Sequence, residues 1–125
     1  MTENELATIV VDLAFAIHTR LGPGLLESAY EAILVYELKQ RGLAVEVQKP
    51  IPVVWDGVDL EIGFRADIIV EGKLILELKS IEEVAPVHKK QLRTYLLLTH
   101  CKLGLLINFN VALIRDGISR VVNGL

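Results

Sequence analysis

Residues 66–79 read ADIIVEGKLILELK, two apolar segments on either side of a short polar loop. Almost every position in both segments is apolar, a pattern typical of strands that are buried on both faces of a sheet. The first segment nevertheless contains Asp67, and the second contains Glu77 and Lys79. Burying an unpaired carboxylate is costly or raises its pKa, so a chain that keeps two of them at such positions usually binds a cation with them. This cluster is therefore the best indication of function.

The length of the loop decides whether these charges meet. A three-residue loop over 71–73, with glycine at its centre, pairs Val70 with Leu74 and places Asp67 opposite Glu77. Opposite side chains on neighbouring strands lie about 4.5–5.5 Å apart at Cβ, close enough for two carboxylates to share a divalent ion. The lysine two residues further on projects to the same face. A two-residue turn would send the acids to opposite faces. We predict the three-residue loop, or a bulge equivalent to it.

Helical periodicity and stop signals predict three helices around these strands. A capping-box spacing at Thr2 opens a helix that runs to Leu21, where Gly22-Pro23-Gly24 ends it. A second periodic segment covers 25–41. A third helix is expected over 86–99, with a proline in its first turn.

Alternating apolar residues and turn signals predict the remaining strands. Asp56-Gly57 is a strong hairpin signal, and Trp55 just before it is expected to cover the core from an edge strand, with stacking on a nucleic-acid base as the alternative. The expected strands are 43–55 at an edge, 58–70 as one long strand bent at Gly63, 73–79, 103–109, and a last hairpin of 111–114 with 118–122.

The resulting order is helix, helix, three-strand meander, helix, strand. Because the two acid-bearing strands are apolar on both faces, they should lie centrally with helices packed on each side. The expected fold class is α/β, with a mixed central sheet flanked by helices.

Composition sets broad limits on the protein class. The length of 125 residues, with 52% hydrophobic and 23% charged content, indicates one globular domain over 1–125. The acidic start does not resemble a secretory signal peptide, and the longest uncharged stretch, 103–114, is shorter than the ~20 residues of a membrane-spanning helix. We therefore expect a cytoplasmic protein without a membrane segment. Cys101, the only cysteine, excludes an internal disulfide and is expected to be buried. His18 is expected to be a partly buried structural histidine rather than a ligand.

The charge distribution limits the ways in which nucleic acid could be bound. A formal net charge of −3 argues against a protein that coats nucleic acid by charge alone. Two local basic clusters remain, Lys89 with Lys90 and Arg93, and Lys39 with Arg41. Either cluster could contact a phosphate backbone, and the alternative for each is an ordinary solvated helix face.

The residue types in the central cluster indicate metal-dependent phosphodiester chemistry. Two carboxylates on a strand pair offer the hard oxygen ligands that Mg²⁺ or Mn²⁺ prefers, and they leave positions open for water and a phosphate oxygen. Such a metal acidifies a water and stabilises charge that builds on phosphorus. A lysine beside it could position the water or neutralise that charge.

These residues also match a known pattern. Asp67 followed by Glu77-Leu78-Lys79 on the next strand resembles the signature of the PD-(D/E)XK nuclease superfamily. Residues 24–30, GLLESAY, fit the motif that names the GxxExxY protein family, a small branch of that superfamily. The resemblance extends to Pro86 and His88 and to the stretch 103–109, so it covers nearly the whole chain. It implies a restriction-endonuclease-like core and a nuclease-like site.

Carried over position by position, the resemblance implies a role for each site residue. Asp67 and Glu77 would be metal ligands, with the Leu78 carbonyl as a third, and Lys79 would be the catalytic lysine. Glu27 would be an additional acid that binds Mg²⁺ or Mn²⁺ directly or through water. The alternative for Glu27 is a glutamate that is stabilised by the helix dipole in the first turn.

Three further polar residues are candidates beside that site. On the third helix, Gln91 and Tyr95 are four residues apart, and in related nucleases such a pair lines the active site. Packing in the core or at the surface is the alternative for Tyr95. Tyr30 could orient Glu27 or simply pack.

Two functions from different classes fit these observations. The first is a metal-dependent nuclease that cuts DNA, with RNA as the second choice. The second is a non-catalytic nucleic-acid-binding or assembly module that retains the nuclease scaffold. One small acidic domain offers little surface to grip a duplex, so a homodimer or a partner protein would supply the rest.

Overall fold

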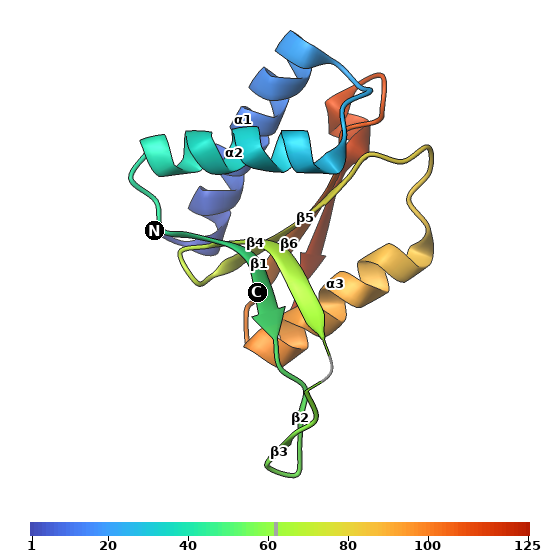
Figure 1. The fold of residues 1–125 in the computed structure, drawn as a ribbon. Helices are drawn as coiled ribbons and strands as arrows, with labels where there is room; N and C mark the ends of the chain where they lie inside the picture. Colours follow the sequence, from blue (N-terminus) through green and yellow to red (C-terminus); the bar gives the residue numbers. More distant parts are fainter. Residues whose placement is uncertain (62) are drawn as a thin grey trace.

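The computed structural model describes residues 1–61 and 63–125. Within this part of the chain, helices and a central sheet form the body of the molecule (Figure 1). The helices are α1 (Glu3–Leu21), α2 (Glu27–Gln40) and α3 (Pro86–Thr99). The sheet contains β1 (Val45–Ile51), β4 (Phe64–Val70), β5 (Leu74–Lys79), β6 (Leu103–Asn108) and β7 (Ile118–Val122), while β2 (Val54–Trp55) and β3 (Val58–Asp59) form a separate hairpin and η1 (Ile114–Gly117) is a short 3₁₀ helix.

The five-stranded sheet has the order β1-β4-β5-β6-β7. β1, β4 and β5 run antiparallel as a meander, and β6 lies parallel to β5 after the crossover through α3. β7 pairs antiparallel with the other side of β6. The predicted order of helix, helix, meander, helix and strand in a mixed α/β sheet is therefore confirmed.

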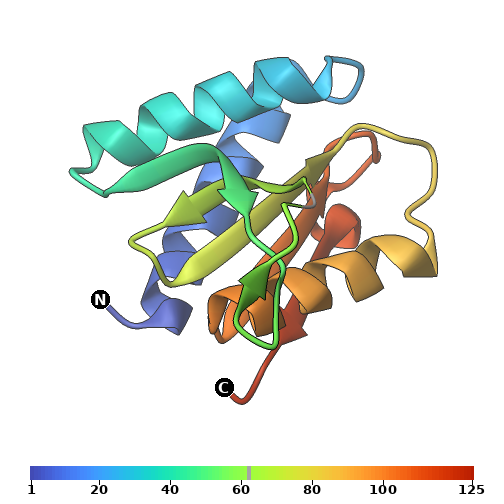
Figure 2. The ribbon, with the colours of Figure 1, turned by 60° about the horizontal axis from the view of Figure 1, so that its bottom comes forward.

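Helices cover both faces of the sheet, which explains why β4 and β5 are apolar throughout. α1 and α2 pack on the face that presents Leu74 and Leu76. α3 packs on the opposite face, where its Leu92 and Leu96 meet Ile75. Figure 2 shows the sheet lying between α2 and α3. Each fully buried leucine or isoleucine contributes about 1.5–3 kcal/mol relative to an exposed one, so both layers hold the sheet in place.

The loop between β4 and β5 has the predicted length. Val70 pairs with Leu74, and the pairing continues through Ile69 with Ile75. Gly72 has a φ of 64°, the left-handed conformation that glycine adopts without steric cost. The three-residue loop and the register that it sets are confirmed, so Asp67 and Glu77 follow on from the paired residues at the same level of the two strands.

Tyr30 fixes the turn that precedes α2. Its hydroxyl donates to the Gly22 carbonyl at 2.6 Å and accepts from the Leu25 N–H at 3.2 Å. Its ring is fully buried and stacks on Phe109, with the ring centroids 4.2 Å apart. Tyr30 therefore packs and anchors the turn, which holds the start of α2 in position. The Ser80 hydroxyl, just after β5, donates to the Leu25 carbonyl at 2.7 Å and ties the two elements together.

Three strand predictions are wrong. Residues 43–55 do not form one edge strand, because β1 and β2 lie in different sheets. Residues 58–70 do not form one strand, because β3 pairs with β2 in the separate hairpin and β4 pairs with β1 and β5; position 62 lies outside the described residues. The predicted hairpin of 111–114 with 118–122 is absent from the described part of the chain, because β7 instead covers the edge of β6. A Cβ at Gly117 would lie 2.2 Å from the Asn108 carbonyl oxygen, so glycine permits the close approach that this return requires.

The prediction for Trp55 is also wrong. Its side chain is 70% exposed, and the β2–β3 hairpin projects from the body of the molecule (Figure 1). The hairpin belongs to a sheet of its own and therefore does not place Trp55 over the core.

The predictions for Cys101 and His18 are confirmed. Cys101 is buried beneath α3. His18 is buried, and its Nε2 lies 2.8 Å from the Val111 carbonyl oxygen, which is a structural contact between α1 and the segment after β6. Among residues 1–61 and 63–125, no helix combines the length and apolar character needed to cross a membrane.

Candidate metal and active site

The two strand acids lie side by side where β4 separates from β5. The last backbone pair between these strands is Ile68 with Leu76. Beyond it, the Leu78 N–H donates to Oδ2 of Asp67 at 2.8 Å, so a side-chain carboxylate takes the place of a backbone carbonyl. Oε1 of Glu77 accepts from the Asp67 N–H at 3.4 Å. The sheet therefore opens at this point and holds both carboxylates in the opening.

Burial and like charge dominate the electrostatics of this acid pair, Asp67 and Glu77. Glu77 is 8% exposed, and its pKa is raised from 4.5 to about 9, first by burial and then by the negative charge of Asp67 and the hydrogen bond between the two side chains. The Asp67 N–H and the positive charge of Lys79 act in the opposite direction. At neutral pH the pair therefore holds a proton in a position where a cation could replace it.

Lys79 ends β5 on the same side of the sheet as Glu77, two residues along the strand. It is partly buried, and its carbonyl accepts the Phe109 N–H at 2.9 Å. The Asn108 side chain, itself buried, donates to the Ile81 carbonyl at 2.9 Å and accepts the Ile81 N–H at 3.2 Å. Bonds from Asn108 and Phe109 thus hold the chain at Lys79 and two residues beyond it.

The α2 acid that reaches the pair is Glu31, which sequence reasoning missed. Nε2 of Gln48 donates to Oε2 of Glu31 at 2.9 Å and to Oδ1 of Asp67 at 3.2 Å, so the amide bridges two carboxylates. The pKa of Glu31 is raised, chiefly by burial, with further increases from the charges of Asp67 and Glu27, while the Gln48 bond lowers it. The helical spacing of Glu27 and Glu31 was the available signal, because residues four apart share a helix face.

Glu27 occupies the first position of α2 and is exposed. Among the described residues its side chain makes no hydrogen bond or ion pair, and its negative charge acts on Glu31, one turn further along the helix. The structure therefore places Glu27 on the same face of α2 as Glu31, which is bridged to Asp67 through Gln48.

Gln48 has a strained backbone. Its φ of 50° is left-handed, which is uncommon for a residue other than glycine. The pairing of β1 with β4 skips it, since Val47 pairs with Ile68 and Lys49 pairs with Ala66. Strain of this kind persists where the surrounding structure imposes it, and here it turns the amide toward the carboxylates.

We predict that Gln48→Ala lowers the free energy of unfolding by about 1 kcal/mol, because the two carboxylates lose their shared donor and the strain remains. Gln48→Gly should be less destabilising than Gln48→Ala, since glycine adopts a left-handed conformation freely. Urea unfolding of the three proteins measures both effects. An alanine variant as stable as the glycine variant would contradict the strained geometry.

α3 contributes Tyr95 to the acid pair. Tyr95 is buried, with its ring tilted against Phe64 at a centroid distance of 5.8 Å. Its pKa is raised by burial and then by the charges of Glu77 and Asp67, so its hydroxyl group lies within their field. Gln91, one turn earlier on α3, is exposed, and no hydrogen bond joins its side chain to another described residue.

His88 and the basic clusters lie outside this centre. Nδ1 of His88 accepts the Ala85 N–H at 3.0 Å and so caps the start of α3. Lys89 lines a hollow together with Glu82, Glu83 and Asp116, and Arg93 donates to the Val122 carbonyl at 3.0 Å. Lys39 and Arg41 stand at the far end of α2, about 20 Å along the helix from its first residue.

Comparison with known proteins assigns this arrangement to a family. Residues 4–121 match the family model of the PD-(D/E)XK nuclease superfamily. The chain belongs to the PD-(D/E)XK nuclease superfamily. Comparison with curated proteins and with solved structures gave no match. Members of this superfamily are typically metal-dependent.

The acid pair of this superfamily member fits a divalent ion that is bound by few protein ligands. Among residues 1–61 and 63–125, no group of three or more His, Cys, Asp or Glu residues is arranged to hold a metal. Mg²⁺ commonly binds through one or two carboxylates and completes its coordination with water and substrate phosphate. Asp67 and Glu77 supply that number of carboxylates, and the pKa of Glu77 is raised first by burial and then by the adjacent charge of Asp67, both of which a bound cation would offset. The donor set therefore suits Mg²⁺ or Mn²⁺ with open coordination positions.

Proposed function

We propose that this chain is a metal-dependent nuclease that hydrolyses phosphodiester bonds, with DNA as the first substrate to test and RNA as the second. The supporting observation is the opening between β4 and β5, which holds Asp67 beside the buried Glu77 with Lys79 on the same strand. We place the chain in the GxxExxY branch on the residues 24–30, and we treat 1–125 as one nuclease-like domain.

In this proposal the acid pair holds Mg²⁺ or Mn²⁺. Asp67 and Glu77 bind through their carboxylates, with Glu77 giving up its proton. The Leu78 carbonyl is a further ligand, because the N–H and C=O of one residue point to the same side of a strand and the Leu78 N–H faces Asp67. When bound, the ion would supply Lewis-acid stabilisation of the charge that builds on the phosphoryl group.

The other residues act on the substrate or on the acids. The ammonium group of Lys79 neutralises charge on the phosphate and orients the attacking water. Gln48 and Glu31 hold Asp67 in place from β1 and α2. Glu27 supports binding of the ion from the exposed first turn of α2, and Gln91 contacts the substrate from the exposed side of α3.

One observation favours a second function. Both oxygens of Asp67 already accept hydrogen bonds from the protein, and Glu77 is protonated at neutral pH, so the acid pair is stable without a metal. A non-catalytic nucleic-acid-binding or assembly module that has kept the nuclease scaffold would show the same contacts.

Cleavage of labelled single-stranded, duplex and branched DNA, and of RNA, in Mg²⁺ or Mn²⁺ distinguishes these functions. We expect Lys79→Met to reduce the cleavage rate about 10²–10³-fold, the usual effect of removing one group that stabilises developing charge. Lys102→Met is the matched control, since Lys102 is exposed beside the opposite end of β6. Equal cleavage by wild type and Lys79→Met would indicate a contaminating enzyme and favour the binding module.

A further inference from the structure

The β2–β3 hairpin exposes an apolar surface that the core does not use. Trp55 is 70% exposed, Val54 is 54% exposed and Val58 is 57% exposed. Trp55 and Val58 pair across the hairpin, with Val54 beside them, and the hairpin projects from the body (Figure 1). Apolar side chains clustered on a projecting element indicate an interaction surface, whereas single exposed apolar residues do not.

The charge of the hairpin identifies the kind of partner. Between Lys49 and Arg65 the chain contains three acids and no Lys or Arg. Asp56, Asp59 and Glu61 are all exposed. A nucleic-acid backbone would be repelled by these carboxylates, whereas an apolar surface bordered by cations would be attracted.

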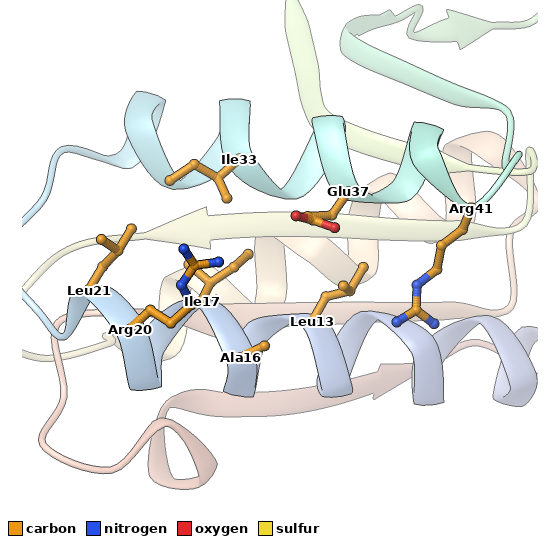
Figure 3. A pocket seen from close by; sticks show the side chains of 8 residues that line it. All are labelled: Leu13, Ala16, Ile17, Arg20, Leu21, Ile33, Glu37 and Arg41. Atoms are coloured by element: carbon orange, nitrogen blue, oxygen red, sulfur yellow. The ribbon is translucent and has the colours of Figure 1, made fainter.

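The groove between α1 and α2 is an apolar surface of this kind, bordered by cations (Figure 3). It has a volume of about 480 Å³, within the usual range of sites that accept a group as large as an indole ring. Its apolar lining comes from Leu13, Ala16, Ile17, Leu21 and Ile33.

Two arginines border this groove. Arg20 and Arg41 stand on either side of Glu37 along its length (Figure 3). In the described part of the chain, neither arginine lies within ion-pairing distance of a carboxylate. Both cations are therefore available to acids from outside the molecule.

We propose that two copies of this chain form a two-fold dimer in which the hairpin of each copy docks in the α1–α2 groove of the other. In Figure 1 the hairpin lies at the end of the molecule opposite α1 and α2, so one chain does not fill its own groove. A single hairpin is much smaller than the ~800 Å² per partner of a standard interface. Reciprocal docking makes both contacts at once and closes the assembly, whereas one-way docking would continue into a filament.

Trp55, the only tryptophan, reports this contact directly. We expect its fluorescence emission to shift to shorter wavelength as protein concentration rises, in parallel with dimer formation measured by sedimentation velocity. Trp55→Ala should weaken association at least about tenfold, as expected for an aromatic anchor at the centre of an interface. Thermal unfolding should be little changed in this variant at low concentration, because the side chain is exposed in the single copy.

Reversing the charges of the groove and of the hairpin tests whether these two surfaces bind each other. Arg20→Glu with Arg41→Glu gives a groove variant, and Asp56→Asn with Asp59→Asn and Glu61→Lys gives a hairpin variant. Asparagine at 59 retains the side-chain oxygen that accepts the Glu61 N–H. Each variant alone should be monomeric, and a mixture of the two should form a heterodimer, because both of its contacts pair opposite charges.

Three results would overturn the proposal. Wild type that stays monomeric at all concentrations would exclude the dimer. A dimer that persists in Trp55→Ala, or a mixture that does not restore association, would place the interface elsewhere. Trp55 emission that changes with added oligonucleotide and not with protein concentration would identify nucleic acid as the occupant. None of these measurements depends on nuclease activity, since the hairpin and groove contain neither acid of the pair.

Discussion

Asp67→Asn is expected to lower metal-dependent cleavage at least about a thousandfold, the loss that accompanies removal of several kcal/mol of metal-derived stabilisation. The substitution takes one negative charge from the acid pair and weakens its hold on a divalent ion. The asparagine oxygen can still accept the Leu78 N–H, so the junction between β4 and β5 is retained. Single-turnover cleavage in Mg²⁺ measures the effect, and thermal unfolding without metal checks that the fold is intact.

Asp12→Asn provides the control for Asp67→Asn. Asp12 is exposed on α1, so its substitution changes the net charge equally without touching the sheet opening. The control should cleave at the wild-type rate. If Asp67→Asn also cleaved at that rate, Asp67 would not be a ligand, and if it failed to fold, the carboxylate would be structural.

The central strand pair could be predicted because local sequence controls it. The loop over 71–73 has a glycine where the backbone turns left-handed, and this sets the pairing of Val70 with Leu74. Because side chains alternate along each strand, this pairing then places Asp67 and Glu77 on the same side of the sheet. Helix boundaries were accessible for the same reason, since the Thr2 capping box and the proline at the start of α3 act on their own neighbours.

The support around the acids could not be predicted, because it depends on contacts between distant elements. Gln48 reaches Glu31 on α2 and Asp67 on β4 only because its backbone is left-handed within an edge strand. A sequence pattern of alternating residues contains no sign of that distortion. The expectation for Glu27 came from its place in the GxxExxY motif, and nothing in the sequence set Gln48 apart from other polar residues.

The errors in strand pairing have a similar origin. The apolar residues of 58–70 fit one long strand, yet those in β3 face solvent while those in β4 enter the core. Periodicity measures the alternation of side chains and does not identify what covers them. The exposure of Trp55 and the pairing of β7 with β6 depend on tertiary structure, so they became visible only in the fold.

Glu77→Gln is expected to stabilise the metal-free protein at neutral and higher pH. Folding raises the pKa of Glu77 from 4.5 to about 9, so this carboxyl favours the folded state fully below 4.5 and loses that contribution as the pH rises toward 9. At pH 7 the penalty is about 3 kcal/mol, because the unfolded chain ionises freely and the folded chain retains a proton. Glutamine occupies a similar volume without a charge and avoids this penalty.

The pH dependence of the free energy of unfolding tests the direction of this effect. In the presence of a chelator, the free energy of unfolding of wild type should fall between pH 5 and pH 9 relative to that of Glu77→Gln, with the two proteins most similar near pH 5. Groups that are common to both proteins, including Glu31 with its raised pKa, cancel in the comparison. Urea unfolding at unit pH intervals measures the difference.

Added Mg²⁺ should reverse this order by binding the ionised pair, which stabilises the wild-type folded state by mass action and leaves Glu77→Gln nearly unchanged. The control is Glu46→Gln, which breaks the exposed ion pair of Glu46 with Lys49 at 2.7 Å and should destabilise by at most about 1 kcal/mol, the opposite direction. A Glu77→Gln protein that is less stable than wild type at pH 8 would show that Glu77 is held as a favourable carboxylate. A metal-induced rise in melting temperature equal in both proteins would place the ion outside this pair and exclude Glu77 as its ligand.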